Sequence, residues 1–205
     1  EDIVNGTALA REYGVKITPP RFGESSAKYT AHPESKTISK GIESVKYLNT
    51  SISESLYEIS KQGFDNFLDV LYAIQDIGIN SRQLEILIKI DYFANLGNIR
   101  ELLKVVEMFD FFKAGAISQI KCDVADTMWC SDIIKKHSTN IGKNGNVLKK
   151  YSVKDGKAII KECYDAIMNM NLKDLNNKLK MAAQKDYLGY IDLTTGREED
   201  RRKLL

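Results

Sequence analysis

The sequence has no long apolar run and few cysteines, and each absence excludes a class of protein. None of its apolar stretches approaches the ~18 residues that a membrane-spanning helix needs. Its first residues have neither the basic flank nor the apolar core of a signal peptide. Its three cysteines, an odd number without a Cys-x-x-Cys pair, suit a reducing cytoplasm better than a disulfide scaffold. We therefore expect a cytoplasmic globular chain with no membrane partner.

Patterns for catalysis and metal binding are also scarce. The chain has no glycine-rich phosphate loop, and its two histidines form no clear pair with a nucleophile. Cys122, Cys130 and His137 recur at helical intervals, but zinc usually takes four ligands with closer cysteine pairs. We therefore expect no metal, no cofactor and no self-contained enzyme. The chain also begins without an initiator methionine and ends without a turn signal, which indicates a piece of a longer protein.

Positive charge is concentrated in one segment. The net charge of +2 is too small to indicate a nucleic-acid partner by itself. Residues 135–161, however, hold eight lysines and a single acidic residue, Asp155. Such a segment suits sequence-independent contact with a phosphate backbone, because each neutralised phosphate releases counterions. A solvated lysine-rich loop is the alternative.

The first 112 residues combine a hairpin pattern with helical patterns. Alternating residues around a turn-rich centre predict a small β-hairpin over residues 27–39. Beyond it, capping signals are expected at three helix starts, namely Ser51 with Glu54, Asn80 with Gln83, and Asn98 with Glu101. Helical apolar spacing predicts a compact helical domain over residues 41–112. The side chains expected in its core are Ile52, Leu56, Leu84, Leu87, Leu103 and Val106.

The rest of the chain is expected to form a connector and the start of another domain. Scattered glycines predict irregular backbone over residues 113–156. Apolar periodicity then predicts helices over residues 159–170 and 172–179. Residues 187–193 have the composition of a strand.

Three groups of segments occur in an order that resembles a known family. They are residues 13–20 (YGVKITPP) followed by Ser25, residues 38–46 (ISKGIESVK) with residues 80–89 (NSRQLEILIK), and residues 184–190 (QKDYLGY). In this order they resemble the alpha subunit of bacterial DNA polymerase III, a C-family replicative polymerase. The resemblance is continuous over about residues 8–112 and resumes at residues 184–193.

The resemblance implies a mainly α fold with a small β-hairpin. It divides the chain into the end of the fingers (1–40), a tandem helix-hairpin-helix domain (41–112), a basic loop with a helical connector (113–183) and the start of an OB domain (184–205). The parent protein would be a DNA-directed DNA polymerase, whose Mg²⁺ ligands belong to a palm domain that nothing here matches. This chain would hold the template–primer duplex by its backbone without reading sequence.

In that family, glycines in two hairpins let the backbone approach a phosphate closely. Here residues 47–49 (YLN) replace the first Gly-Val-Gly, and residues 90–93 (IDYF) replace Ala-Gly-Ala-Phe. Asn49 tolerates a left-handed conformation, whereas the Asp91 carboxylate would repel a phosphate. The residues expected to contact DNA are Lys46, Asn49, Thr50, Lys89, Lys135, Lys136, Lys149 and Lys150.

A second partner is suggested by residues 108–112 (MFDFF). They are similar to the short peptides by which such polymerases dock on the sliding clamp, with Phe109, Phe111 and Phe112 as the contact residues. The same residues continue a helical apolar stripe, so packing in the core is the alternative. For the whole chain, the alternative to DNA binding is a protein-interaction module that docks the clamp or another replisome subunit.

Overall fold

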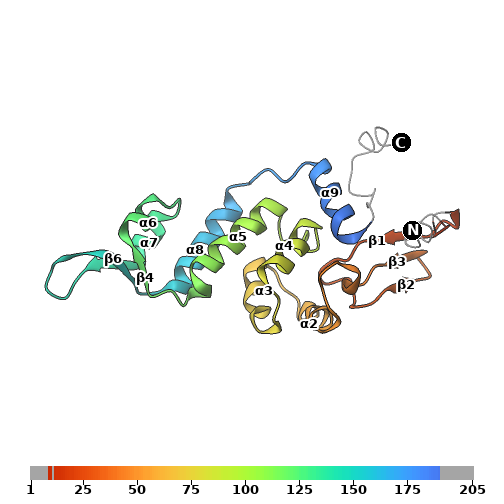
Figure 1. Cartoon of the computed structure of the whole chain (residues 1–205), viewed down its shortest axis with the longest axis horizontal. Coiled ribbons are helices and arrows are strands. Elements are labelled where there is room, and N and C mark those ends of the chain that lie inside the picture. Colours follow the sequence, from red (N-terminus) through yellow and green to blue (C-terminus); the bar gives the residue numbers. More distant parts are fainter. Residues whose placement is uncertain (1–8, 11, 190–205) are drawn as a thin grey trace. The chain divides into compact units, whose positions relative to one another are not determined.

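The chain forms two compact units, which are described separately (Figure 1). A computed structural model describes residues 9–10 and 12–189. Unit 1 comprises residues 1–100 and 173–205, and unit 2 comprises residues 101–172. Unit 1 is therefore discontinuous in sequence, because the whole of unit 2 lies between its two parts. One helix, α5 (Ile99–Phe111), begins in unit 1 and continues into unit 2. The domain ranges expected from the sequence stay a prediction.

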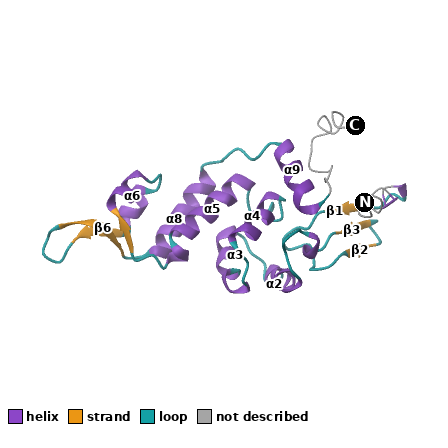
Figure 2. Cartoon of the chain, in the orientation of Figure 1, coloured by secondary structure: helices purple, strands orange, loops and turns teal. Residues whose placement is uncertain are grey.

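Unit 1 begins with a three-stranded sheet in the order β1-β3-β2 (Figure 2). Strands β2 (Thr30–His32) and β3 (Thr37–Ser39) are antiparallel and form the predicted hairpin. Strand β1 (Lys16–Thr18) pairs in parallel with β3, with Ile17 opposite Ile38. The prediction of a single hairpin was therefore incomplete, because a parallel partner contributed by an earlier segment leaves no local turn signal.

Helices make up the rest of unit 1. They are η1 (Ile42–Ser44), α2 (Thr50–Ser60), α3 (Phe67–Ala73), η2 (Gln75–Ile77), α4 (Ser81–Lys89), the start of α5, and α9 (Asn177–Leu188). The predicted capping box of α4 is present, with Asn80 and Gln83 bonded reciprocally. The start of α2 was predicted too late. Its N-cap is Asn49, whose side chain accepts a hydrogen bond of 2.8 Å from the amide of Ile52, so Ser51 already lies in the first turn.

An aromatic cluster forms part of the core of unit 1. The rings of Phe22, Tyr92 and Phe93 lie 4.8 to 5.8 Å apart between centroids. Four of the predicted core side chains are buried with them, namely Ile52, Leu56, Leu84 and Leu87. This core fixes the ends of α2 and α4, and these ends carry the loops described below.

Helix α5 buries a stripe that differs from the predicted one. Leu102 and Val105 are buried, whereas Leu103 and Val106 are only half-buried. Leu102 and Leu103 are both apolar, so periodicity alone does not decide between two adjacent stripes. The observed stripe continues through Met108.

Unit 2 contains a second three-stranded sheet, in the order β4-β6-β5, where the sequence predicted irregular backbone. Its elements after α5 are η3 (Lys113–Gly115), β4 (Gln119–Lys121), α6 (Cys122–Thr127), α7 (Ser131–Lys136), β5 (Ser138–Ile141), β6 (Val147–Val153) and α8 (Gly156–Asn169). Both strand pairs are antiparallel. Helix α8 agrees with the predicted helix over residues 159–170. The fold is thus mainly helical, as predicted, but with two small sheets.

The end of the described chain also differs from its prediction. The helix expected over residues 172–179 begins only at Asn177. The strand expected over residues 187–193 is wrong as far as it can be followed, because α9 continues to Leu188 and is closed by Gly189 at φ +74°. Residues 190–193 lie outside the described residues. A glycine at this φ ends a helix without side-chain strain.

Candidate nucleic-acid interface

The first loop, residues 45–49, joins η1 to α2 and is exposed around its tip. Tyr47 adopts φ +71°, and the amide of Leu48 bonds to the carbonyl of Val45 at 3.2 Å. Asn49 is extended, at φ −105° and ψ 168°, as suits an N-cap. The left-handed residue of this loop is therefore Tyr47 and not Asn49, because the side chain of Asn49 is engaged in capping.

The beginning of α2 presents unpaired amides to solvent. Thr50 and Ser51 are exposed, and within the described part of the chain their amide groups make no hydrogen bond. The first turn of α2 carries no acidic residue. Lys46, also exposed, forms no ion pair with any described residue. Amide donors, the positive end of the helix dipole and a lysine make this helix end suited to an anion.

Helix α4 supports the first loop and adds a cation that the sequence did not indicate. The side-chain amide of Gln83 donates a hydrogen bond of 2.8 Å to the carbonyl of Tyr47. The guanidinium of Arg82 lies over the Tyr47 ring, 4.4 Å from its centroid. Because Arg82 is separated from the loop by 35 residues, only the fold reveals that it belongs to this site.

Helix α9 also contacts the backbone of the first loop. The amide of Lys46 donates a hydrogen bond of 2.9 Å to the carbonyl of Tyr187. The Lys46 side chain remains exposed, so this contact fixes the backbone and leaves the charge available. The predicted residues Lys46, Asn49 and Thr50 thus lie together at one helix end.

The second loop, residues 90–98, joins α4 to α5 and has the opposite character. Asp91 stands at φ +63°, a backbone conformation that favours glycine, and is 7% exposed. Lys180 of α9 donates to both carboxylate oxygens of Asp91, at 3.1 and 3.2 Å, and forms a second ion pair with Asp174. Arg21 donates to the Asp91 carbonyl. The carboxylate expected to repel phosphate is therefore buried and neutralised by an ion pair.

The first amide of α5 also has a hydrogen-bond partner within the chain. The amide of Ile99, its first residue, donates a hydrogen bond of 3.1 Å to the Asp174 carboxylate. Burial alone would lower the pKa of Lys180, but its hydrogen bond to Asp174 and the charge of Asp91 outweigh burial and raise that pKa. Lys180 is therefore protonated at neutral pH. Lys89, predicted to contact DNA here, is ion-paired with Glu85 at 2.6 Å.

In unit 2, the predicted lysines divide into paired and unpaired groups. Lys135 bonds to Asp126 at 2.9 Å, and Lys136 bonds to Glu162 at 2.8 Å. These hydrogen bonds hold the pKa of both carboxyl groups below their usual range. Lys149 and Lys150, both exposed on β6, form no ion pair with any described residue.

Two of the three aromatic side chains of the proposed clamp peptide are buried. Phe109 and Phe112 are 6% and 0% exposed, whereas Phe111 is 36% exposed. A docking peptide must present its apolar side chains to the partner, and two of these three are buried. Their burial favours packing in the core, which was the alternative interpretation of the segment.

The three side chains considered as metal ligands have other partners. His137 contacts Glu162 at 2.8 Å between its Nε2 and a carboxylate oxygen. A hydrogen bond to Cys130, together with burial, raises the pKa of the Cys163 thiol. Over residues 9–10 and 12–189, no three His, Cys, Asp or Glu side chains gather closely enough to hold a metal ion. Among the helices of these residues, none is long and apolar enough to cross a membrane.

Comparison with known proteins gives one family match. The family described as a helix-hairpin-helix motif matches residues 14–103. The match covers the first sheet, both loops, helices α2 to α4 and the beginning of α5. The chain thus carries a motif associated with DNA binding, and the first loop, with its open helix end, lies inside it.

Proposed function

We propose that this chain binds the backbone of duplex DNA without reading its sequence, and that the first loop is the main contact of unit 1. The observation that carries the proposal is the open start of α2. Thr50 and Ser51 are exposed and their amides make no hydrogen bond with described residues, and the exposed Lys46 precedes them in the same loop. A phosphate at this position would accept hydrogen bonds from the amides and pair with the lysine. Arg82 would add a second positive charge beside it.

The second loop would have a structural role in this proposal. Its glycine-like position is occupied by Asp91, and the first amide of α5 already bonds to Asp174. In the tandem arrangement that the sequence resemblance implies, one loop would hold phosphate and the other would be fixed inside the unit. DNA binding would then depend on a single open hairpin.

The parent activity that we propose is template-directed DNA synthesis by a bacterial replicative polymerase. Support comes from the order of residues 13–20, 38–46 and 80–89, which resembles the alpha subunit of DNA polymerase III. In that family, the Mg²⁺ ligands belong to the palm domain, and this chain would position the duplex behind it. The coding sequence upstream of residue 1 tests this assignment, since three palm aspartates are expected there.

A proline at the first position of α2 tests the phosphate contact directly. Thr50→Pro removes one amide donor, yet proline is favoured at this helix position and the extended Asn49 is compatible with it. Thr50→Ala removes the same hydroxyl but keeps the amide. We expect Thr50→Pro to bind a 30-base-pair duplex about tenfold more weakly than Thr50→Ala, as the loss of one charge-assisted hydrogen bond predicts.

The weakening should be the same for duplexes of unrelated sequence, because a phosphate contact carries no base information. Fluorescence anisotropy on two such duplexes measures both points. Equal affinities of the two variants would show that the start of α2 does not hold phosphate. Absence of any salt-dependent binding by the wild-type chain would instead favour docking to a replisome protein.

A further inference from the structure

In unit 2, four lysines without ion pairs lie on one β-ribbon. The ribbon, residues 138–154, consists of β5, a turn and β6, and it contains four lysines and no acidic residue. Lys143, Lys149, Lys150 and Lys154 are exposed, and none forms an ion pair with a described residue. By contrast, Lys135, Lys136 and Lys161 are all paired with carboxylates.

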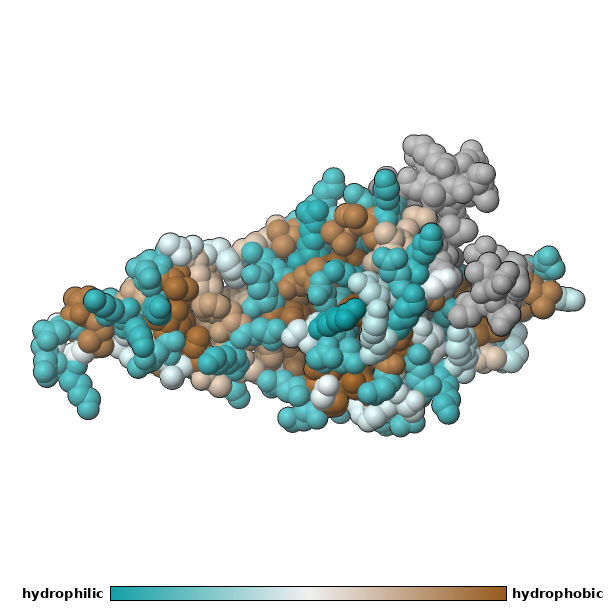
Figure 3. Space-filling view, in the orientation of Figure 1, coloured by the Kyte–Doolittle hydropathy of each residue, from teal (hydrophilic) through white to brown (hydrophobic). Residues whose placement is uncertain are grey.

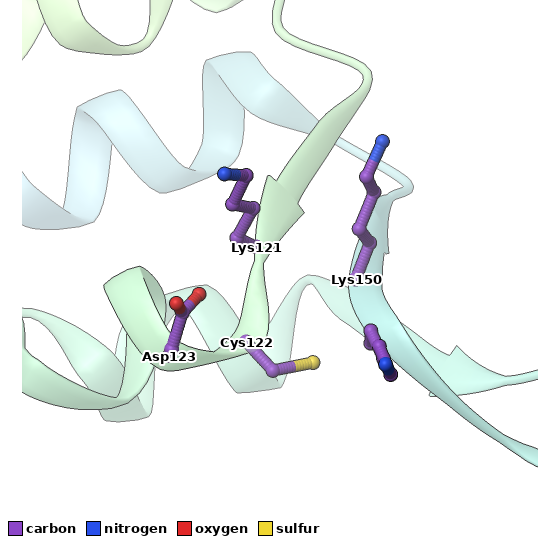
Figure 4. Close-up of a pocket in the computed structure, with 5 residues that line it drawn as sticks. Lys121, Cys122, Asp123 and Lys150 are labelled. Atoms are coloured by element: carbon purple, nitrogen blue, oxygen red, sulfur yellow. The ribbon is translucent and has the colours of Figure 1, made fainter.

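Strand β4 adds another lysine directly opposite the ribbon. Lys121 of β4 is in register with Lys150 of β6, so the two side chains emerge on the same face of the sheet. Figure 4 shows both side chains directed to the same side. Together with Cys122, Asp123 and Lys149, they line a hollow of about 480 Å³. Like charges directly opposite each other destabilise a sheet. Asp123 is the one carboxylate in this lining, so the face remains positive.

The end of the ribbon exposes apolar side chains beside these charges. Ile141, Val147 and Leu148 flank the turn and are 53, 74 and 43% exposed. Figure 3 shows hydrophilic side chains extending from the ribbon end with a hydrophobic patch next to them. Single exposed aliphatic side chains are common on protein surfaces, but neighbouring ones mark an interaction site more often. A ribbon that enters a groove can place them against sugars and bases.

We infer that the ribbon is a second DNA contact, which enters the major groove of a duplex and binds the phosphates on either side. This inference rests on the proposed binding of duplex DNA. The major groove is about 12 Å wide and admits a two-stranded β-ribbon. Lys121, Lys143, Lys149 and Lys150 contact phosphates, and the apolar tip contacts the groove floor. The Lys121–Lys150 repulsion is relieved when a phosphate lies between the two ammonium groups.

Charge neutralisation tests the phosphate contacts of the ribbon. In the full chain, the variant Lys121→Gln/Lys143→Gln/Lys149→Gln/Lys150→Gln should flatten the slope of log affinity against log salt by about one unit per lost contact. The matched control is Lys135→Gln/Lys136→Gln/Lys161→Gln, which removes three lysines that already have carboxylate partners. Its slope should stay near that of the wild type. Titrations of one duplex at four salt concentrations give both slopes.

A second variant tests the contact made by the apolar tip of the ribbon. Ile141→Ser/Val147→Ser/Leu148→Ser should lower the affinity while leaving the salt slope unchanged, because no phosphate contact is lost. The seven substituted positions are all exposed. Two strand pairs are among them, Lys121 with Lys150 and Ile141 with Val147, so far-UV circular dichroism checks the fold of each variant.

The outcomes separate the ribbon from the first loop. An unchanged slope in the ribbon variant, together with weaker binding by Thr50→Pro, would overturn the ribbon contact and leave the proposed function standing. No duplex binding by the wild-type chain would overturn both. Binding of the wild-type chain to phosphatidylserine vesicles but not to DNA, lost in the ribbon variant, would assign the ribbon to a lipid surface and overturn the inference.

Discussion

The two loops of unit 1 share a backbone feature but have opposite surroundings. Each places a non-glycine residue at positive φ, Tyr47 at +71° and Asp91 at +63°. Tyr47 is 57% exposed and leads into a helix whose first amides are unpaired. Asp91 is buried, its carboxylate is paired with Lys180, and the helix that follows has its first amide bonded to Asp174.

If the first loop binds phosphate as proposed, a hairpin conformation does not by itself make a phosphate site. Such a site also needs backbone amides at the start of the following helix that have no hydrogen-bond partner within the chain. In the second loop, the Asp174 carboxylate already accepts a hydrogen bond from the first amide of α5. The first loop retains its donors, so DNA binding and stability are expected to depend on different residues.

The largest loss of stability is expected when the ion pair between Lys180 and Asp91 in the second loop is removed. Lys180→Met would leave the Asp91 carboxylate buried without its cation, and loss of one partner of a buried pair costs about 3–5 kcal/mol. Urea unfolding measures the change. Lys178→Met, an exposed position on the same helix, is the control and should lie within about 0.5 kcal/mol of the wild type. Equal unfolding free energies for the two variants would contradict the structural role of the ion pair.

Lys40, another lysine of unit 1, differs from Lys180 in the predicted pH dependence of its contribution to stability. Lys40, just before the first loop, is 2% exposed, and burial lowers its pKa from 10.5 to about 8. Between these values the unfolded chain binds the proton and the folded chain does not, so stability should rise as the pH rises from about 8 to 10.5. Lys40→Met should lack this rise.

The measurement is the difference in unfolding free energy between wild type and Lys40→Met at pH 7.5 and pH 10.5. We expect the difference to shift in favour of the wild type by roughly 2–3 kcal/mol, since one pKa unit corresponds to about 1.4 kcal/mol. A difference that does not vary with pH would mean that Lys40 keeps its proton throughout. Lys180, whose pKa is raised, should give no such change below pH 10.5.

The smallest effect concerns the cap of the first loop. Asn49→Ala removes the acceptor for the Ile52 amide and should cost about 1 kcal/mol, whereas Asn49→Asp keeps an acceptor and should cost much less. In DNA binding the order should reverse, because Asp places a negative charge next to the proposed phosphate. Thermal unfolding measures the stability of the two variants, and fluorescence anisotropy measures their affinity for duplex DNA. Equal DNA affinities would place the phosphate elsewhere.

Local signals were sufficient for part of this fold. The capping box of Asn80 and Gln83 and the hairpin of β2 and β3 are formed by residues close in sequence, and both were predicted. The parallel pairing of β1 was not, because its partner strand follows about 20 residues later. Strand β6 was missed since only Tyr151 among its residues is buried, which leaves no alternating apolar face.

The candidate site was predictable to a similar extent. The resemblance placed Lys46, Asn49 and Thr50 at one loop, and the fold brings them together. The pairing of Asp91 with Lys180 spans 89 residues, so nothing in the hairpin segment indicates it. The carboxylate partners of Lys135 and Lys136 come from other elements, Asp126 from α6 and Glu162 from α8. Only the fold shows that these pairs form. Counting lysines therefore located the basic segment but not the lysines that remain unpaired.

The discontinuity of unit 1 determines the order in which its loops can be completed during synthesis. A chain leaves the ribosome from its N-terminus, so Asp91 emerges long before Lys180 and Lys46 long before Tyr187. All of unit 2 is translated in the interval. Until α9 emerges, the nascent second loop holds an unneutralised carboxylate and the first loop lacks its last backbone contact. Maturation of both loops is therefore a late event in biosynthesis, because both depend on helix α9.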